Sequence, residues 1–448
     1  MTMLTFEVMA PLMFGGLIVF LLIGYPVAFS LSFVGLAFGA LAIHLGFFSL
    51  SLLQALPDRI FGIMANQLLL SIPFFTFMGA VLERCGLAEE LLDTMGQLFG
   101  PIRGGLAYAV ILVGALLGAI TGTVAASVIA MGLISLPVMQ RYGYDAKVAT
   151  GVIAASGTIT QIIPPSLVLV VLADAMGKSV GDMYAGAFIP SFILVGLFCA
   201  WIFIVSIVWP EKVPALPKEV RTASVKVLFW RCMVSMVPSL FLIFMVLGTI
   251  LVGLATPTEG GAMGAVGALG LAILHKRLNM AVLKESMDIT LKLTTMVMFI
   301  LVGSTVFSLT FRGVDGDLWV EGLLSNLPGG QFGFLLFVNV FVFFLAFFLD
   351  YFEIAFIIIP LLAPVAEKMG IDLIWFGVLI GVNMQTSFMH PPFGFALFYL
   401  RSVAPPSIKS SEILLGSIPW VFIMLLMVIL VILFPGMVSL SVQIFGRF

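Results

Sequence analysis

Two polar stretches interrupt long apolar segments and decide the fold. The first reads SGTITQIIPPS and covers residues 156–166; the second reads NMQTSFMHPP and covers residues 383–392. Their double prolines, Pro164-Pro165 and Pro391-Pro392, lie 227 positions apart. A proline removes a backbone N–H donor and pushes the preceding residue out of the α region. Each stretch therefore predicts a helix that breaks inside an apolar segment.

The composition places these breaks in a membrane. Of 448 residues, 62% are hydrophobic and 9% are charged, with 20 Lys and Arg against 22 Asp and Glu. Soluble domains carry about 25% charged residues, so a soluble enzyme and a disordered chain are excluded. A nucleic-acid-binding protein is excluded because it needs a clustered basic excess. The sequence predicts an all-α polytopic membrane protein, long enough for roughly ten spans of about 20 residues.

The apolar runs divide into full spans and two longer segments. We expect full spans at about 9–25, 27–47, 67–83, 146–177, 186–209, 232–254, 259–275, 290–311, 374–403 and 414–436. The longer runs, 105–141 and 332–368, are interrupted at 120–123 and 349–353. Each long run is either two spans or one re-entrant hairpin. Hairpins are favoured because the break residues make poor tight turns, and Asp350 and Glu353 are ionisable.

The basic residues indicate the orientation, since cytoplasmic loops are enriched in Lys and Arg. With two hairpins that return to their own side, one side collects Arg84, Arg103, Arg141, Lys147, Lys212, Lys218, Arg221, Lys226, Arg231, Lys276, Arg277, Lys284, Lys292, Arg401 and Lys409. The other side has Arg59, Lys178, Arg312, Lys368 and Arg447. The first side is predicted to be cytoplasmic, with both termini periplasmic. Counting each hairpin as two crossings gives the same bias, so charge alone leaves that alternative open.

The chain also contains an internal repeat. Helix-breaking residues match at an offset of 227: Gly86 with Gly313, Pro101 with Pro328, Pro137 with Pro364, Gly143 with Gly370, Asp145 with Asp372, and the two double prolines. Upstream, an offset of 231 matches Pro26 with Pro257 and His44 with His275. Each half holds five spans and one hairpin, and an odd number of spans inverts the second half. Inverted repeats with broken helices near the midplane are typical of secondary transporters.

The breaks suggest ion chemistry. Unwound backbone survives in a membrane only where protein or a cavity surrounds it. The freed carbonyls and nearby hydroxyls suit a small hard cation, most plausibly Na⁺, and the restarting helix presents N–H groups to an anion. Because break and hairpin both occur twice, we expect at least two Na⁺ ions. The alternative is a pair of kinks that serve packing only.

Four ionisable residues at membrane depth, Glu259, Asp350, Glu353 and His390, are functional candidates, with Asp174 near the end of a span. Asp350, at the second hairpin tip, could bind a cation or cap a helix together with Glu353. Glu259 follows Pro257 and reads as a first-turn acid. His390 could bind a substrate carboxylate or carry a proton, or be held by hydrogen bonds alone.

Four motifs resemble the large membrane subunit of tripartite ATP-independent periplasmic (TRAP) transporters. They are GAITGT at 118–123, GT at 157–158 with PPS at 164–166, PTE at 257–259 and PPFG at 391–394. The resemblance covers essentially the whole chain. It implies an elevator-type transporter of the ion-transporter superfamily that takes up an organic acid with Na⁺. It also implies a small membrane subunit of about four helices and a soluble periplasmic binding protein.

The resemblance assigns candidate site residues. One Na⁺ would be held by Thr121, Gly122, Ser156, Gly157 and Thr160, and another by Leu349, Asp350, Asn383, Thr386 and Met389. Candidate substrate contacts are Thr123, Thr158, Ser166, Ser387 and His390. Two departures bear on these assignments: many relatives carry Thr where this chain has His390, and small residues where it has Phe352-Glu353.

The predicted organisation follows the repeat. Scaffold helices occupy 1–84 and 229–311, hairpins and broken helices that form a transport domain occupy 85–180 and 312–405, a connecting span and loop occupy 181–228, and the last span occupies 406–448. The expected location is the bacterial cytoplasmic membrane. One alternative is a self-sufficient Na⁺/dicarboxylate symporter of the same superfamily. An intramembrane protease is disfavoured because its G-x-S-G, G-x-G-D and H-E-x-x-H motifs are absent, and no P-loop for ATP occurs.

Overall fold

The structure is a computed structural model that describes residues 6–121, 123–217 and 225–446. The described part is helical throughout. Its first half contains α1 (Phe6–Ile23), α2 (Val27–His44), the 3-10 helix η1 (Leu50–Ala55), α3 (Leu56–Met64), α4 (Ser71–Arg84), α5 (Leu87–Phe99), α6 (Gly105–Thr121), α7 (Val124–Arg141), α8 (Ala146–Thr158), the 3-10 helix η2 (Ile159–Gln161), α9 (Leu167–Ala175), α10 (Val180–Val208) and η3 (Pro210–Lys212).

The second half repeats this order with small changes. It contains α11 (Val225–Leu251), α12 (Pro257–Leu274), α13 (Met280–Gly313), α14 (Gly316–Ser325), α15 (Gly330–Leu345), α16 (Tyr351–Glu353), the π-helical η5 (Ile354–Ile358), α17 (Ile359–Lys368), α18 (Leu373–Gln385), the 3-10 helix η6 (Thr386–Phe388), α19 (Phe395–Val403), α20 (Ser410–Leu433) and α21 (Gly436–Phe445).

Six described helices are long and apolar enough to cross a membrane, or seven if the bent pair α14 and α15 counts as one span. Five of them, α1, α2, α10, α13 and α20, coincide with predicted spans. The sixth is α7, an arm of the first predicted hairpin. The chain is a multi-pass membrane protein. Length alone does not separate a hairpin from two spans, because α7 has 18 residues.

Both hairpin breaks lie close to their predicted places. The first long run divides into α6 and α7, which pack against each other. The second divides into α15 and the continuous α16, η5 and α17, with the break at 346–350. Here the prediction was off by a few residues, because Tyr351, Phe352 and Glu353 already belong to the returning helix.

Short amphipathic helices were missed by the sequence analysis. Helices α5 and α14 precede the two hairpins, and α14 meets α15 at an angle of 117°. Helix α3 precedes α4, and α21 follows the last span. A search for apolar runs long enough to span a membrane overlooks these helices, because they have only 9 to 13 residues.

The internal repeat is present in the backbone itself. Helices α8 and α18 begin and end 227 residues apart, as do η2 and η6. The Pro164–Pro165 and Pro391–Pro392 peptide bonds are both cis. Asp145 and Asp372 each cap the following helix by accepting backbone N–H bonds. The matched residues of the sequence thus hold equivalent backbone positions.

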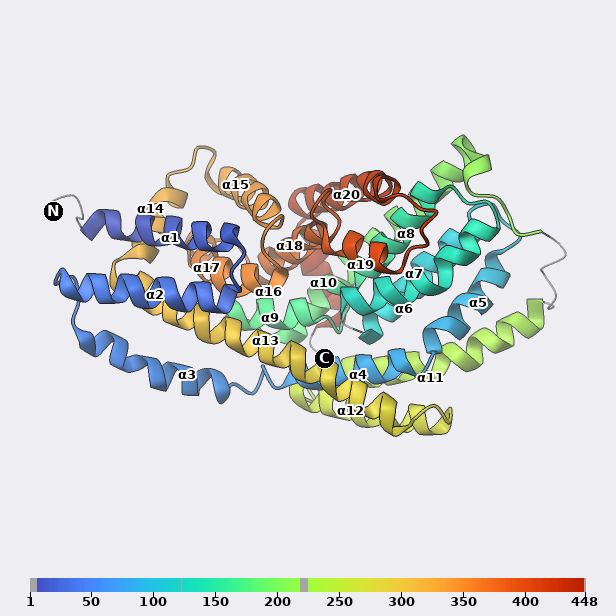
Figure 1. Ribbon diagram of the computed structural model, residues 1–448, viewed down its shortest axis with the longest axis horizontal. Helices are drawn as coiled ribbons and strands as arrows, with labels where there is room; N and C mark the ends of the chain where they lie inside the picture. Colours follow the sequence, from blue (N-terminus) through green and yellow to red (C-terminus); the bar gives the residue numbers. More distant parts are fainter. Residues whose placement is uncertain (1–5, 122, 218–224, 447–448) are drawn as a thin grey trace.

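The two halves are interleaved. Helix α4 of the first half packs along α12 of the second, and α2 packs along α13. These four helices, with α3 and α11, run along one long edge of the molecule (Figure 1). The hairpins and the broken helices lie above them in the same view. Close packing is visible where Gly35 meets the Val306–Phe307 backbone: a Cβ there would lie 2.9 Å from it.

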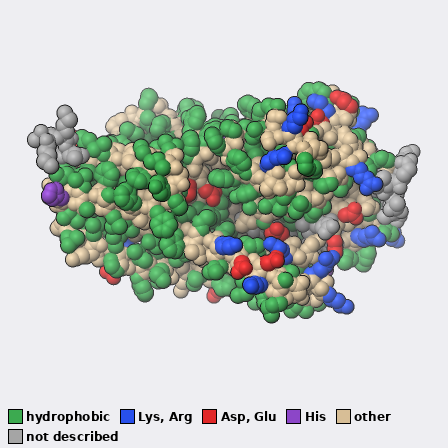
Figure 2. Space-filling model, in the orientation of Figure 1, with side chains coloured by type: hydrophobic (Ala, Val, Ile, Leu, Met, Phe, Trp, Pro, Cys, Tyr) green, Lys and Arg blue, Asp and Glu red, His purple; other side chains and the backbone are tan. Residues whose placement is uncertain are grey.

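Charged side chains gather in one half of the molecule. On the face drawn in Figure 2, most Lys and Arg lie in the half that carries α5, α7, α8 and the α19–α20 connection, whereas hydrophobic side chains dominate the other half. Four ion pairs each join residues of one predicted side: Arg84–Glu285, Arg277–Glu90, Lys178–Glu367 and Lys368–Glu321. The four pairs are consistent with the predicted sides, which remain a prediction.

Candidate functional site

The first break lies between α8 and α9. Helix α8 runs to Thr158, so Ser156, Gly157 and Thr158 belong to its last turn and not to the unwound segment. The Ser156 hydroxyl donates to the Val152 carbonyl at 2.6 Å. All three residues are fully buried.

The rest of this break is held by its own hydroxyls. Thr160 donates to the Gly157 carbonyl at 3.0 Å, and Ser166 donates to the Gln161 carbonyl. Ser166 also accepts from the Val168 and Leu169 N–H groups and so caps α9. In contrast, the side-chain nitrogen and oxygen of Gln161 are both buried and have no hydrogen-bond partner in the part of the chain that the structure describes.

The second break lies between α18 and α19. Thr386 donates to the Asn383 carbonyl at 2.6 Å, and Ser387 donates to the Met384 carbonyl at 2.5 Å. The Asn383 amide nitrogen donates to the carbonyl and side-chain oxygens of Asn339 on α15, at 2.8 and 3.0 Å. The Asn383 side-chain oxygen is buried and has no hydrogen-bond partner among the residues described. Asn383 therefore ties the break to its own hairpin and leaves one oxygen free.

The two breaks meet each other. The Gln385 amide nitrogen donates to the Thr158 hydroxyl at 3.5 Å. These residues lie 227 positions apart, so they are equivalent members of the two repeats. A contact between equivalent residues lies on the axis that relates the repeats. The broken helices thus cross at the centre of the pseudosymmetry.

The first hairpin approaches its break through glycine. A Cβ on Gly114 would lie 2.6 Å from the Ser156 Cβ, and one on Gly118 would lie 3.0 Å from the Thr160 Cα. Helix α6 can therefore lie directly on the end of α8 and on η2. The tip includes two predicted ion ligands: Gly122 lies outside the described residues, as does the side chain of Thr121. Thr123 stands at the start of α7 with extended backbone.

The second hairpin tip is a capping box. The Asp350 carboxylate accepts from the Tyr351 N–H at 2.6 Å, and the Glu353 carboxylate accepts from the Asp350 N–H at 2.9 Å. The capping role that the sequence suggested for Asp350 is confirmed. The Tyr351 ring faces the Phe388 ring at 6.2 Å between centroids, which joins this tip to η6. Leu349, beside Asp350, is buried.

His390 lies between aromatic rings. Its ring centroid is 4.1 Å from that of Phe343 and 4.5 Å from that of Phe347. It is 1% exposed, and neither ring nitrogen has a hydrogen-bond partner within residues 6–121, 123–217 and 225–446. The expectation that this histidine is merely hydrogen-bonded is therefore wrong for the described structure. Met389, which precedes it, is buried and its N–H donates to the Thr386 carbonyl.

Each half-helix also packs on the hairpin of the other repeat. Helix α9 contacts α16, η5 and α17, and α19 contacts α7. Gly132 on α7 faces Val403 and Leu400 of α19 so closely that a Cβ would lie 2.8 and 2.9 Å from them. The two hairpins and the two broken helices therefore interlock.

The donor set suits a hard cation. The side-chain oxygens of Gln161, Asn383 and Gln385 are buried and have no hydrogen-bond partner among the described residues. A buried polar atom without a partner costs about 1–3 kcal/mol. Bound Na⁺ would satisfy such oxygens. No group of three or more His, Cys, Asp or Glu side chains occurs among the residues described. The candidate donors are amide, hydroxyl and carbonyl oxygens, together with the Asp350 carboxylate.

Glu259 has the role that the sequence suggested. Thr256 and Glu259 form a capping box at the start of α12, with Pro257 in its first turn. The Glu259 carboxylate accepts from the Thr256 N–H at 2.8 Å. Thr258 donates to the Gln67 carbonyl of the α3–α4 connection. Glu259 is thus separate from both breaks.

Comparison with known proteins decides the family. The family model "Tripartite ATP-independent periplasmic transporter, DctM component" matches residues 14–437. This chain belongs to the DctM family of TRAP transporter large permeases. It is a transporter subunit and not an enzyme, and a tripartite system supplies two further components.

Relatives of the permease extend over nearly its whole length. It is 32% identical to the C4-dicarboxylate TRAP transporter large permease protein DctM of Pseudomonas aeruginosa, over 90% of this chain and 92% of the relative. It is 26% identical to the 2,3-diketo-L-gulonate TRAP transporter large permease protein YiaN of Escherichia coli, over 94% and 96%. The Alcanivorax borkumensis YdaH transporter has a similar fold, with a TM-score of 0.60 at 14% identity over 86% and 88% of the two chains.

Several site residues of the permease escaped the sequence analysis. Gln161 and Gln385 stood in the quoted polar stretches, and Asn339 is an isolated amide in an apolar helix. An amide inside an apolar helix is a usable signal, because it has to find a partner there. The aromatic cage of Phe343 and Phe347 had no such signal, because the chain contains 42 phenylalanines.

Proposed function

We propose that this permease couples the uptake of an organic acid to Na⁺, and that a periplasmic binding protein delivers the acid. The observation that carries the proposal is the crossing of two broken helices at Gln385 and Thr158, flanked by buried oxygens without partners. Inverted repeats that cross near the midplane are the usual setting for substrate and coupling ions. The lack of a P-loop leaves an ion gradient as the driving force.

At least two Na⁺ ions would bind, one at each break. Ser156, Gly157 and Thr160, with the first hairpin tip, would serve one ion. Asn383, Thr386 and Met389, with Leu349 and Asp350, would serve the other. The freed oxygen of Asn383 supports the second site most directly, because its amide nitrogen is fixed by Asn339.

The substrate would bind between the breaks. The start of α9, where Ser166 caps the Val168 and Leu169 N–H groups, carries the positive end of the helix dipole, which favours an anion. Thr123, Thr158, Ser387 and His390 are the further candidate contacts. The named relatives transport C4-dicarboxylates and 2,3-diketo-L-gulonate, which supports an organic acid as the substrate class.

The movement would be that of an elevator. Hairpins and broken helices interlock through α9 on the second hairpin and α19 on the first, so they would travel as one transport domain of residues 85–180 and 312–405. The helices along the opposite edge, from 1–84 and 229–311, would form the inverted-repeat scaffold and dock the small four-helix subunit. Both termini would face the periplasm.

Reconstitution tests this proposal. Proteoliposomes that hold the permease and its small subunit, with the binding protein and a radiolabelled C4-dicarboxylate outside, should accumulate the acid only with an inward Na⁺ gradient. Equal uptake with K⁺ in place of Na⁺ would contradict Na⁺ coupling. Full uptake by the permease alone would instead support the self-sufficient symporter. A panel of keto and hydroxy acids identifies the substrate if the first acid is not transported.

A further inference from the structure

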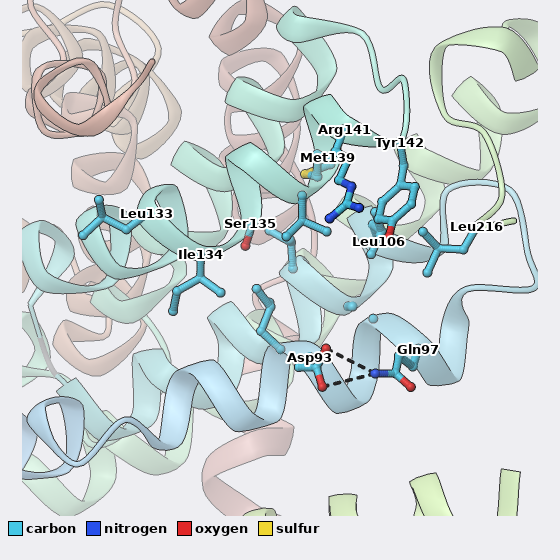
Figure 3. Close-up of a pocket in the computed structure, with 15 residues that line it drawn as sticks. Asp93, Gln97, Leu106, Leu133, Ile134, Ser135, Met139, Arg141, Tyr142 and Leu216 are labelled. Atoms are coloured by element: carbon cyan, nitrogen blue, oxygen red, sulfur yellow. Dashed lines mark hydrogen bonds between the residues drawn. The ribbon is translucent and has the colours of Figure 1, made fainter. Parts of the chain in front are cut away.

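A large cleft lies away from the breaks, between α5 and the arms of the first hairpin. Its volume is about 620 Å³. Asp93 and Gln97 on α5 lie across it from Ser135 and Arg141 on α7 and from Tyr142, which directly follows α7 (Figure 3). Arg141 lies at the end of α7 that is opposite to the hairpin tip, so the cleft is separate from the proposed ion sites.

The charged groups in this cleft do not satisfy each other. Arg141 makes no ion pair with any residue in the described ranges, and its guanidinium lies 5.9 Å from the Tyr142 ring centroid. The Asp93 carboxylate accepts only from the neutral Gln97 amide, at 3.2 and 3.3 Å, among the contacts of the described chain. Ser135 is 2% exposed, and its hydroxyl has no hydrogen-bond partner among the described residues. The cleft thus offers one free positive group, one carboxylate and one buried hydroxyl.

The equivalent place in the second repeat is closed by the protein. Lys368 stands where the first repeat has Arg141, and its ammonium pairs with Glu321 of α14 at 2.5 Å. Val320 stands where the first repeat has Asp93. In the second repeat the basic residue Lys368 therefore pairs with a carboxylate of the protein. In the first repeat the equivalent Arg141 is left for a group from outside the chain.

The rest of the cleft is apolar and extends to membrane depth. Leu133 and Val138 of α7 line it and are 57% and 39% exposed. Leu133 precedes Arg141 by eight residues, which is about 12 Å along a helix. One leaflet of the hydrocarbon core is about 15 Å thick. An acyl chain could therefore lie along Leu133 and Val138 while its headgroup reaches Arg141.

We propose that this cleft binds one phospholipid with a phosphate and a primary ammonium, namely a phosphatidylethanolamine. The phosphate accepts from the Arg141 guanidinium, and the ammonium donates to the Asp93 carboxylate. Ser135 faces the ester region, and the acyl chain covers Leu133 and Val138. An anionic lipid would match Arg141 but would leave Asp93 without a cation.

Native mass spectrometry of the delipidated permease complex tests this site. The complex is titrated with dioleoyl phosphatidylethanolamine, phosphatidylglycerol and phosphatidylcholine. Wild type should bind the ethanolamine lipid about tenfold more tightly than the other two, since only this lipid offers a charged N–H donor to the carboxylate: the glycerol hydroxyls are neutral donors and choline has no N–H. Arg141→Gln should weaken all three lipids, and Asp93→Asn should bring the ethanolamine lipid to the level of phosphatidylglycerol.

Controls separate this reading from folding defects and from simple phosphate binding. Arg59→Gln removes an exposed arginine of α3 outside the cleft and should leave every affinity unchanged. Leu133→Trp keeps both charged groups but fills the acyl path, and it should weaken all lipids while the complex stays monodisperse. Equal affinities of the three lipids for wild type, an unchanged preference in Asp93→Asn, or displacement by inorganic phosphate would each overturn the proposal.

Discussion

The two broken helices share a backbone and differ in their chemistry. Helices α8 and α18 have the same length, end in the same 3-10 turn and begin behind the same aspartate cap. At equivalent positions, however, the first repeat has Ser156, Gln161, Ile163 and Thr123, and the second has Asn383, Phe388, His390 and Asp350. Proline, glycine and capping residues thus fix the repeated fold. The side chains that stand between these residues differ, and they give the two halves different chemistry.

The hairpins approach the breaks in different ways as well. The first hairpin lies on its break through Gly114 and Gly118, where a side chain has no room. The second reaches its break through aromatic rings, with Tyr351 against Phe388 and His390 between phenylalanines. Close backbone packing tolerates little change, whereas a cluster of rings can adjust. We expect the first interface to be the more sensitive of the two.

Labelling of the hairpin bases tests the inversion of the repeats, with an all-or-none effect. Arg103 precedes α6 and Gln331 begins α15, and both are exposed. In a variant without the three native cysteines, Arg103→Cys should react with a membrane-impermeant thiol reagent only from the cytoplasm. Gln331→Cys should react only from the periplasm. Labelling of both from one side would rule out an inverted repeat. Position Lys218, in the predicted cytoplasmic loop, lies outside the described residues.

Gly114→Ala tests the close contact of the first hairpin. The new Cβ would lie 2.6 Å from the Ser156 Cβ, so α6 has to move off the end of α8. Overpacking costs about 1–3 kcal/mol, and we expect most Na⁺-driven uptake to be lost while the protein still inserts. Gly196→Ala is the matched control, because no atom lies within 4 Å of its added Cβ. Normal uptake in Gly114→Ala would show that the contact is unimportant.

Asp350→Asn tests the charge that only the second hairpin tip carries. Asparagine caps helices as well as aspartate does, so the capping box should survive. The loss of the charge should raise the Na⁺ concentration for half-maximal uptake by about tenfold, or roughly 1.4 kcal/mol. Glu259→Gln changes the other capping box, at α12, and should shift it much less. An unchanged Na⁺ activation curve in Asp350→Asn would remove this residue from the ion site.

His390→Phe separates packing from substrate contact in the aromatic cage, with the smallest expected effect. Two unpartnered ring nitrogens are costly, so phenylalanine should raise the free energy of unfolding by about 1 kcal/mol. The half-saturation concentration of the organic acid should rise a few-fold, because a polar contact is lost. Thermal unfolding and uptake titrations measure the two effects. If uptake is unaffected, His390 serves packing alone.

Much of the fold could be predicted from the sequence. The double prolines, the repeated glycines and the aspartate caps act locally, so their positions in the sequence give the positions of the breaks. The hairpin break near Asp350 was less certain. The sequence predicted that Tyr351 and Phe352 belong to the break, whereas in the structure they begin the returning helix. The amphipathic helices α5 and α14 carry no long apolar run, so a search for spans does not find them.

The site was harder to predict, because its contacts join distant segments. Nothing near Gln385 in sequence indicates that its amide meets Thr158 of the other repeat. The support of Asn383 by Asn339 likewise depends on how α15 packs against α18. The free oxygens of Gln161 and Asn383 become visible only when every other hydrogen-bonding partner has been located.

The central claim is that hairpins and broken helices move together past a static scaffold. Spin labels on exposed positions at the two hairpin bases, Ile102 and Phe332, and on α3 of the scaffold, Phe61, allow a direct test. Distances are measured by pulsed electron resonance without Na⁺ and with Na⁺, substrate and loaded binding protein. The account predicts a constant distance from Ile102 to Phe332 and a shift from Phe61 to Phe332 on the order of one helical turn, about 5 Å, or more. A changed distance between the hairpin bases with a constant distance to Phe61 would contradict the elevator and favour a gated pore.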